Sequence, residues 1–335
     1  MVIQKEGDGS MEERPSVQDR EKTPAHRREE AVRDLLGLNL ELTNVCPFRC
    51  PQCYVPSGGK TRFLSRETAL GWIRDADRNG IRYVNMSGGE TLCYPFLEEL
   101  IRECAGRGMK ASVSISGASA SKEKLLGLHA AGISSICVSL NGSTAEINNV
   151  TRQGYEEGLA ALRWLKEIPD CVTLVNFVMH GSNAADLTDL LRLLEDYDVY
   201  ALVILGNLPA ADGQAFDPPS GAQIRSAARM LEQYRGPVKW LVNGCFYELR
   251  SLLSGSQNLD AERDFSGCTA GITHLSVTAD GQLTPCNHLD FPETYDSIGA
   301  YLSDSGTIKK LRALAEADPL FRPCLEDRDC LRKEG

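Results

Sequence analysis

The sequence lacks three features that would place the protein in a membrane, in the secretory pathway or on nucleic acid. No apolar run approaches the ~18–20 residues that span a bilayer. The N-terminal segment has no basic stretch followed by an apolar one, which is the order of a secretory signal. No cluster of Lys and Arg is present to bind phosphates, and the formal net charge is −10. We therefore predict a cytoplasmic protein with neither a membrane nor a nucleic-acid partner, whose acidity serves solubility.

Cysteine, by contrast, is abundant, because the chain of 335 residues contains 12 of them. Thiols stay reduced in the cytoplasm, so this number favours metal ligation or redox chemistry over structural disulfides. The densest group is the stretch CPFRCPQCY, which contains Cys46, Cys50 and Cys53.

The order of the apolar segments predicts an α/β fold. Between residues 38 and 206, six short runs rich in Val, Ile and Leu alternate with segments of helical spacing. Such alternation predicts right-handed βαβ units and a parallel sheet covered on both faces. Eight repeats would close a barrel, so six predict an open, partial (β/α)6 barrel. Ser65 is expected to cap the first helix.

Three regions follow from this pattern. Residues 1–33 mix charges with Gly, Pro and Ser and are expected to form a disordered arm. The barrel is assigned to residues 34–240, after which the alternation stops. Residues 241–335 are predicted to form a small α+β domain with a β-hairpin that turns at Asp280-Gly281. The cysteines of this last region are Cys268, Cys286, Cys324 and Cys330.

Closely spaced cysteines such as those at 46, 50 and 53 occur in three kinds of site. A structural zinc site needs a fourth Cys or His, and the next 12 positions after Cys53 contain neither. A redox CxxC pair accounts for Cys50 and Cys53 but leaves Cys46 without a role. A cubane iron–sulfur cluster has four iron corners, so three thiolates leave one iron open to a small molecule.

The cysteine loop and a second motif together resemble a known family. Cys46-x3-Cys50-x2-Cys53 follows the first predicted strand, and the tetrapeptide SGGE at Ser87 to Glu90 follows the second. This combination is similar to the radical S-adenosylmethionine (radical SAM) superfamily. The resemblance implies a [4Fe–4S] cluster whose open iron binds S-adenosylmethionine. It also implies that an electron from the cluster cleaves the sulfonium and releases a 5′-deoxyadenosyl radical for hydrogen-atom abstraction.

The resemblance also assigns residues to the bound cofactor. Gly88 and Gly89 would let the backbone approach it closely, and Glu90 would accept a hydrogen bond from its amino group. An ordinary strand-to-helix turn is the alternative account of this motif. Arg152 is placed like the arginine that pairs with the cofactor carboxylate in many relatives, and a solvated arginine at a helix start is its alternative. Further groups expected near the ribose are Ser116, Ser139 and Asn141.

Two residues beside the third cysteine compare differently with that family. Tyr54, directly after Cys53, matches a common variant and is counted among the cofactor-binding residues. Gln52 stands where relatives often have an aromatic residue or His, which there contacts adenine.

The C-terminal cysteines follow a second known pattern. The stretch GCTAGITHLSVTADGQLTPC resembles the extension called SPASM in its full form and twitch in its shortened form. The four C-terminal cysteines would ligate one auxiliary [4Fe–4S] cluster, which fits the shortened form. A tetrahedral zinc site is the alternative. A fully ligated auxiliary cluster would transfer electrons, whereas an incompletely ligated one would coordinate substrate.

Five cysteines remain outside both sets. Cys104, Cys137 and Cys171 lie in helix or strand patterns and are expected to be small core residues. Packing at a helix start is the expectation for Cys93. Cys245 is a buried thiol, an extra cluster ligand or a hydrogen-atom donor to a substrate radical.

Together these features predict a radical SAM oxidoreductase of the SPASM/twitch subgroup. Such relatives crosslink, oxidise or epimerise ribosomally made peptides, or they dehydrogenate or epimerise small molecules such as aminocyclitols and sugars. We expect a precursor peptide as substrate, with a small molecule as the alternative, and a flavodoxin- or ferredoxin-type electron donor. His180 and Asn176 are weaker candidates for a base. The competing class is a non-enzymatic metal-binding or electron-carrier protein, which would need no open iron.

Overall fold

The computed structural model describes residues 37–55, 60–208, 216–253, 270–288, 293–304 and 306–307. In these ranges nine strands form one sheet in the order β7-β6-β5-β4-β3-β2-β1-β8-β9. In this order every strand from β7 across to β8 is parallel to the strand beside it, and β9 alone is antiparallel to its neighbour, β8. The strands are β1 (Gly37–Glu41), β2 (Tyr83–Ser87), β3 (Lys110–Ile115), β4 (Ser135–Ser139), β5 (Val172–Val178), β6 (Ala201–Leu205), β7 (Lys239–Val242), β8 (His274–Val277) and β9 (Leu283–Thr284).

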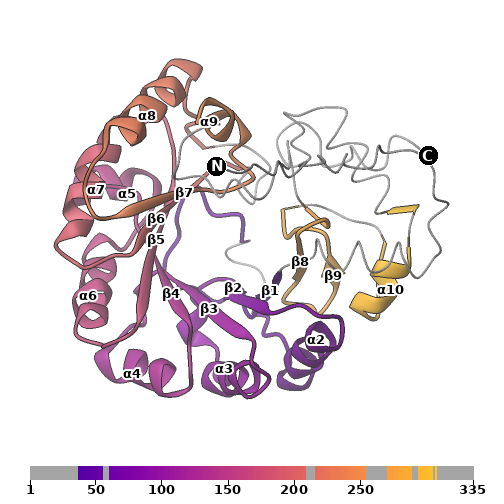
Figure 1. Cartoon of the computed structure of the whole chain (residues 1–335). Coiled ribbons are helices and arrows are strands. Elements are labelled where there is room, and N and C mark those ends of the chain that lie inside the picture. The colour runs from indigo at the N-terminus through magenta and orange to yellow at the C-terminus, as the bar shows by residue number, and fades with distance from the viewer. Residues whose placement is uncertain are drawn as a thin grey trace, which may run out of the picture.

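The helices lie along the outer side of the curved sheet, as Figure 1 shows for α2, α3, α4, α6, α7 and α8. None of the helices in the described ranges is both long enough and apolar enough to cross a membrane. The α-helices are α2 (Arg66–Arg78), α3 (Leu97–Gly106), α4 (Lys122–Ala130), α5 (Ala145–Thr151), α6 (Tyr155–Lys166), α7 (Leu187–Glu195), α8 (Gly221–Gln233), α9 (Tyr247–Leu252) and α10 (Ile298–Ser303). Two short 3₁₀ helices are η1 (Thr91–Cys93) and η2 (Ala184–Asp186).

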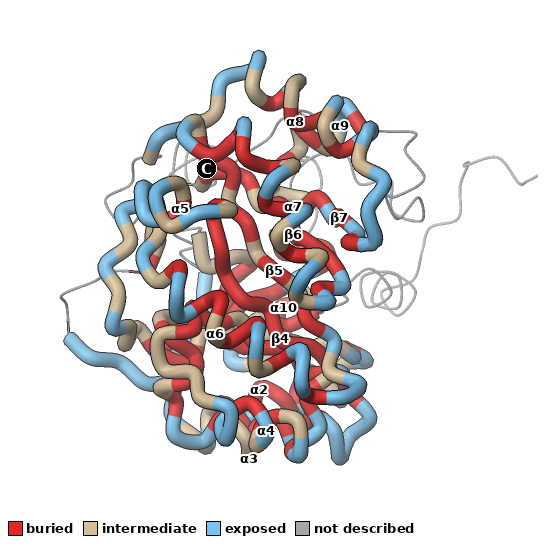
Figure 2. The backbone as a smooth tube through the Cα atoms, turned by 90° about the vertical axis from the view of Figure 1, so that its left-hand side faces the viewer, coloured by how far each residue is buried: buried red, intermediate tan, exposed pale blue. Residues whose placement is uncertain are grey.

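The helices form where the apolar residues recur at helical spacing. In α7, Leu187, Leu190, Leu191 and Leu194 are all buried, so one stripe of the helix faces the sheet. Ser65 caps α2 as predicted, because its side chain accepts a hydrogen bond from the Thr68 N–H at 3.1 Å. Figure 2 shows the buried residues concentrated along the strands and on the helix sides that face them.

The two faces of the sheet differ in chemistry, because residues along each strand alternate between apolar and polar. The sheet is therefore apolar on its helix-covered face and polar on its inner face. Side chains on the helix-covered face are apolar and almost fully buried, as at Leu38, Leu40, Val84, Met86, Val113, Val175 and Phe177. Side chains on the inner face are largely amides and hydroxyls, as at Asn39, Asn85, Ser112, Ser114, Ser139 and Asn176. Successive side chains of a strand point to opposite faces of the sheet, which makes this separation possible. The inner face is thereby available to form a polar site.

The parallel α/β sheet is the architecture that the alternating pattern predicts, with two more parallel strands than the six expected, β7 and β8. β7 continues the sheet after α8, in register with β6 at Leu202 and Trp240. It is only four residues long and begins with Lys239, so its apolar run of three residues is shorter than the usual strand pattern. The predicted arm at residues 1–33 lies outside the described residues.

The predicted β-hairpin is present, and it joins the main sheet. β8 and β9 are connected through Asp280-Gly281, where the Gly281 N–H donates to the Thr278 carbonyl at 2.8 Å. β8 pairs in parallel with β1, so the hairpin lies at the edge of the barrel next to the first strand. Its turn contacts the segment that precedes α2, because Arg62 in that segment donates a hydrogen bond to Asp280 at 2.8 Å. The hairpin is thereby placed beside the cysteine loop that follows β1.

Candidate active site

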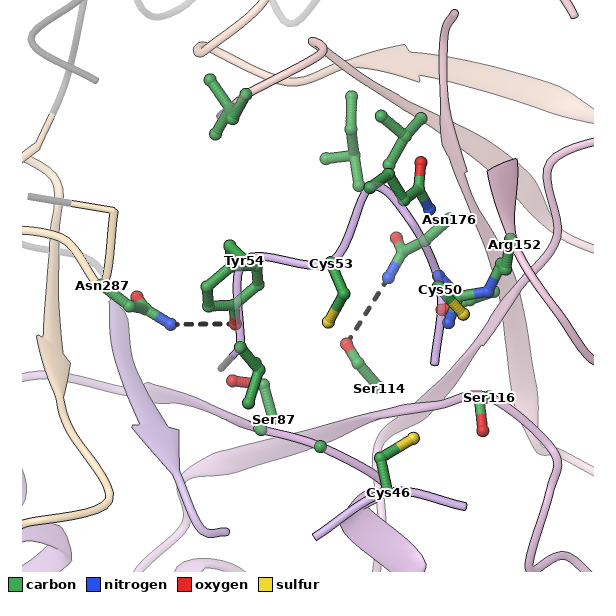
Figure 3. Close-up of a pocket in the computed structure, with 18 of the residues that line it drawn as sticks. Cys46, Cys50, Cys53, Tyr54, Ser87, Ser114, Ser116, Arg152, Asn176 and Asn287 are labelled. Atoms are coloured by element: carbon green, nitrogen blue, oxygen red, sulfur yellow. Dashed lines mark hydrogen bonds between the residues drawn. The ribbon is translucent and has the colours of Figure 1, made fainter. Parts of the chain in front are cut away.

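A cavity of about 630 Å³ opens at the carboxyl ends of the strands, on the inner side of the curved sheet. Its wall includes the loop that follows β1, and Cys46, Cys50 and Cys53 all line it (Figure 3). The remaining wall comes from the ends of β2 to β6, from the segment after β7 and from the segment after β9. Ligands of parallel α/β sheets bind at this strand end, so this cavity is the candidate active site.

The cysteine loop is fixed by hydrogen bonds to its own backbone and to the junction of α5 and α6. Residues 50–53 form a β-turn in which the Cys53 N–H donates to the Cys50 carbonyl at 3.1 Å. The Gln153 N–H donates to Cys50 Sγ at 3.3 Å. Arg49 Nη1 donates to the Cys46 carbonyl at 2.6 Å. Three sequence-predicted ligands are therefore held on one short, well-anchored segment.

Burial affects the protonation of these thiols. It raises the pKa of Cys46 and of Cys53 above the usual thiol value, so both are neutral thiols near neutral pH. Metal ligation requires thiolates and would release these protons. In the described part of the chain, no three side chains of Cys, His, Asp or Glu already converge as a metal site.

The two glycines of the SGGE motif lie where β2 meets the start of the cysteine loop. A Cβ atom on Gly89 would be 2.2 Å from the Val45 carbonyl oxygen, and one on Gly88 would be 2.3 Å from that of Thr43. The N–H groups of Gly89 and Glu90 donate to these same two residues, to Thr43 O at 2.6 Å and to Val45 O at 2.7 Å. The glycines therefore permit close contact between two backbone segments, and both also line the cavity.

Glu90 is completely buried behind this wall. One carboxylate oxygen accepts from the Leu92 N–H at 3.1 Å, and the other accepts from the N–H of Ser116 at 3.0 Å and from its hydroxyl. Ser116 lines the cavity, whereas Glu90 is not part of its lining. In this structure the carboxylate holds the ends of β2 and β3 together.

The other predicted cofactor residues divide between the cavity wall and the layer behind it. Ser139 and Arg152 line the cavity. Arg152 Nε is buried and has no hydrogen-bond partner among the described residues. Asn141 is fully buried behind the wall, where its side chain donates to Gln52 and to Thr151, each at 2.9 Å.

Tyr54 contacts the segment that follows β9, a contact that the sequence did not reveal. Its hydroxyl accepts from Asn287 Nδ2 at 3.2 Å (Figure 3), and its ring centroid lies 4.2 Å from that of His288. Asn287 Oδ1 in turn accepts from the Ser276 hydroxyl at 2.6 Å. Asn287 and His288 both line the cavity. No local motif marks them, because their position depends on the pairing of β8 with β1.

The floor of the cavity is polar and uncharged. Asn85 Nδ2 donates to Asn39 Oδ1 at 2.7 Å, and the Ser87 hydroxyl donates to the same oxygen at 2.9 Å. Ser114 and Asn176 continue this surface across β3 and β5. Among the described residues that line the cavity there is no Asp, Glu or Lys. Recognition at the floor would therefore proceed through neutral hydrogen bonds.

Glu41 is the last residue of β1, and no sequence motif marks it as a site residue. Burial raises the pKa of its carboxyl from 4.5 to about 7, although Arg62 acts in the opposite direction. Between these two values the unfolded chain loses the proton while the folded protein keeps it. The free energy of unfolding should therefore fall as the pH rises from 4.5 to 7.

We accordingly expect Glu41→Gln to stabilise the metal-free protein at about pH 8, by up to ~3 kcal/mol, and to leave it unchanged at about pH 4. Chemical denaturation at the two pH values measures the difference. Glu232→Gln, on the exposed side of α8, is the matched control and should alter stability little at either pH. Equal stability of wild type and Glu41→Gln at the higher pH would contradict this account of Glu41.

The remaining predicted residues fall in several environments. Cys104 and Cys137 are buried and Cys171 packs against the core, as expected for structural thiols. Cys93 Sγ lies 3.4 Å from the Ser119 hydroxyl. Cys245 lines the cavity, on the segment after β7.

The C-terminal cysteines are described only in part. Cys286 follows β9, and its Sγ accepts from the His288 N–H at 3.4 Å. The other three lie outside the described residues: Cys268, Cys324 and Cys330.

The structure is thus an open parallel α/β barrel whose first strand leads into a three-cysteine loop at a cavity. Residues 40–194 match the family model described as the radical SAM superfamily. The matched stretch is slightly less than half of the chain, and it contains both the cysteine loop and the SGGE motif. The family predicted from the cysteine loop and the SGGE motif is thus confirmed, whereas the SPASM/twitch subgroup stays a prediction.

Two curated relatives share part of the chain. It is 31% identical over 215 residues to a PqqA peptide cyclase of Rhodopseudomonas palustris and 26% identical over 215 residues to that of Bradyrhizobium diazoefficiens. Each alignment covers 61% of this chain and 56% of the relative. The chain therefore spans about half the length of the curated relatives it matches.

Solved structures of low identity share the fold. Streptococcus suis SuiB bound to S-adenosylmethionine aligns with a TM-score of 0.69 at 16% identity, over 84% of this chain and 68% of that one. The protein anSMEcpe with bound AdoMet aligns with a TM-score of 0.65 at 15% identity, over 84% of this chain and 83% of that one. At these identities the likeness establishes the open α/β architecture.

Proposed function

We propose that the protein is a radical SAM enzyme that cleaves S-adenosylmethionine reductively and removes a hydrogen atom from a peptide. The observation that carries this proposal is the position of Cys46, Cys50 and Cys53 on one cavity wall together with Arg152. When bound, a [4Fe–4S] cluster with S-adenosylmethionine supplies a 5′-deoxyadenosyl radical and methionine after one electron enters the sulfonium.

The chain's own residues fit these groups. Three thiols from one loop supply three of the four ligands of a cubane and leave one corner open. The buried Nε of Arg152 needs an acceptor, which the cofactor carboxylate would provide in a charge-assisted hydrogen bond. Gly88 and Gly89 present backbone without side chains at the cavity wall, and Ser116 and Ser139 present hydroxyls there. In the arrangement of this structure, Glu90 would act behind the wall by holding Ser116.

Two observations support a peptide substrate. The curated relatives are named as cyclases of a peptide, and solved structures of the same fold contain the bound precursor peptide SuiA and the bound Kp18Cys peptide. A cavity of about 630 Å³ is the size of a small-molecule site. It would hold the cofactor and one side chain of a peptide whose remainder lies outside. Crosslinking, oxidation and epimerisation all begin with the hydrogen abstraction proposed here.

The C-terminal region, residues 241–335, would complete the enzyme. We propose that Cys268, Cys286, Cys324 and Cys330 bind one auxiliary [4Fe–4S] cluster in a twitch-like domain. A flavodoxin- or ferredoxin-type protein would supply electrons. Cys245 faces the cavity as a hydrogen-atom donor or extra ligand would require.

The proposed function is tested by reconstituting the purified protein with iron and sulfide without oxygen and adding S-adenosylmethionine and dithionite. Formation of 5′-deoxyadenosine is the expected result. Its absence, with zinc as the only bound metal, would favour the metal-binding class instead. Mass spectrometry of a precursor peptide encoded beside the gene, after co-expression, then separates a peptide substrate from an aminocyclitol or sugar.

Arg152→Leu is expected to weaken S-adenosylmethionine binding to the reconstituted protein by about tenfold or more. A buried charge-assisted hydrogen bond contributes roughly 1.5–3 kcal/mol, which corresponds to this range. Isothermal titration or equilibrium dialysis measures the dissociation constant. Arg163→Leu, on the exposed side of α6, is the control and should bind as wild type does. Unchanged affinity in Arg152→Leu would assign the carboxylate contact to another group.

A further inference from the structure

We propose that Gln52 is a positioning residue, which fixes the turn that carries Cys50 and Cys53 instead of contacting the nucleotide. Gln52 is the third residue of the β-turn 50–53, and Pro51 is the second, the position that Pro favours in common turns. The two flanking cysteines are ligands only under the proposed function, whereas the geometry of the turn does not depend on it.

Gln52 reaches across the cavity wall to the ends of two strands. Its Oε1 accepts from Asn141 Nδ2 at 2.9 Å and is hydrogen-bonded to His180 Nε2. Asn141 follows β4 and His180 follows β5, and both have no exposed surface. One loop residue is therefore joined to two completely buried side chains of the barrel.

Those two partners are themselves held in fixed orientations. Asn141 Oδ1 accepts from the Val178 N–H at 3.0 Å, so its Nδ2 must point toward Gln52. Gln52 then presents its oxygen to both partners. On the other side of the His180 ring, Nδ1 lies 2.8 Å from the Phe216 carbonyl oxygen and 2.9 Å from Asn207 Nδ2. The Asn183 side chain also joins the two residues through their backbones. Its Oδ1 accepts from the His180 backbone N–H at 2.7 Å, and its Nδ2 donates to the Asn141 backbone carbonyl at 3.0 Å. The anchor for Gln52 is thus a rigid, buried polar network rather than a mobile surface group.

The opposite side of the same turn is fixed independently by Gln153. Its N–H donates to Cys50 Sγ at 3.3 Å, and its side-chain oxygen accepts from the Arg49 N–H at 2.7 Å. Gln153 therefore fixes the first cysteine of the turn from the α5–α6 junction. Gln52 would fix the second half of the turn, which ends at Cys53. The distance between the two sulfurs then depends on the Gln52 contacts.

A first test uses the metal-free protein, so that its result does not depend on the cofactor. Gln52→Met keeps the length of the side chain and removes the acceptor. Limited alkylation with iodoacetamide, read for each cysteine by mass spectrometry, should show Cys50 and Cys53 reacting about tenfold faster, which is the scale of two lost hydrogen bonds. Cys46 precedes the turn and should react at the wild-type rate.

Two further variants separate positioning from other effects. Gln52→Glu keeps an acceptor for Asn141 and His180 and should return the alkylation rates to wild-type values. Gln233→Met, on the exposed side of α8, should change nothing. Thermal melting verifies that each variant is folded, and Gln52→Ala replaces Gln52→Met where the latter is unstable.

A second test uses the reconstituted protein in a background that lacks the four C-terminal cysteines. The electron paramagnetic resonance spectrum of the reduced cluster should broaden in Gln52→Met and not in Gln233→Met. Unchanged alkylation and an unchanged spectrum, combined with weaker S-adenosylmethionine binding in Gln52→Met, would overturn the proposal and make Gln52 a nucleotide contact. Failure of the proposed function alone would appear as wild-type protein that forms no cluster while the alkylation result holds.

Discussion

A protein in which Cys46, Cys50 and Cys53 are all replaced by Ala is expected to form no 5′-deoxyadenosine and to bind about four fewer iron atoms than wild type. The three thiols lie on one loop and line one cavity, so no other described segment supplies a second set at that position. Iron and sulfide analysis after anaerobic reconstitution, together with chromatography of the nucleoside product, measures both effects. A single replacement should act almost as strongly, because the residues work as one unit.

The matched control for this experiment is Cys171→Ala. Cys171 packs against the core just before β5, away from the cavity, and should retain iron content and product formation. Removal of Cys286 should lower the iron content while leaving the N-terminal cluster able to bind S-adenosylmethionine. Full iron content in the triple variant would place the metal elsewhere and remove the basis of the proposed function.

The barrel could be predicted because its information is local. The apolar spacing within a short window indicates each of the six predicted strands and the helices between them. Parallel strands joined by helices then allow few topologies. The cysteine loop could be predicted for the same reason, because all three thiols lie within one short stretch of the sequence. β7 was missed because it is only four residues long and begins with Lys239, which leaves an apolar run of three residues.

The contacts between distant segments could not be predicted in the same way. Asn287 and His288 reach Tyr54 only because β8 pairs with β1, and no residue near position 287 encodes that pairing locally. The raised pKa of Glu41 likewise depends on what surrounds it in the folded barrel. The role of Gln52 shows the same limit, because its partners at 141 and 180 are contributed by two other strands.

The glycines of the SGGE motif lead to the second large expected effect, which concerns Gly89→Ala. A Cβ atom at this position would lie 2.2 Å from Val45 O and 2.6 Å from the Val45 carbonyl carbon. Backbone atoms cannot turn aside as a flexible side chain does, so the segment 43–45 must move away. Two short hydrogen bonds, from the N–H groups of Gly89 and Glu90, would be lost in the process.

We expect Gly89→Ala to lower the free energy of unfolding by about 3 kcal/mol or more, the range seen when strain and lost buried hydrogen bonds combine. Because Val45 immediately precedes Cys46, the same displacement should reduce iron incorporation in the protein that still folds. Denaturant titration and iron analysis at a temperature below the transition measure the two effects separately.

Gly71→Ala is the matched control, since Gly71 lies in α2 and an added Cβ meets nothing within 4 Å. Alanine is the better helix former, so this variant should be more stable than wild type by roughly 0.5–1 kcal/mol and should incorporate iron normally. If Gly89→Ala were as stable as Gly71→Ala, the glycine would be required for contact with the nucleotide rather than for the approach of β2 to the cysteine loop. Stability lost with iron incorporation retained would instead separate the glycine's structural role from the placement of Cys46.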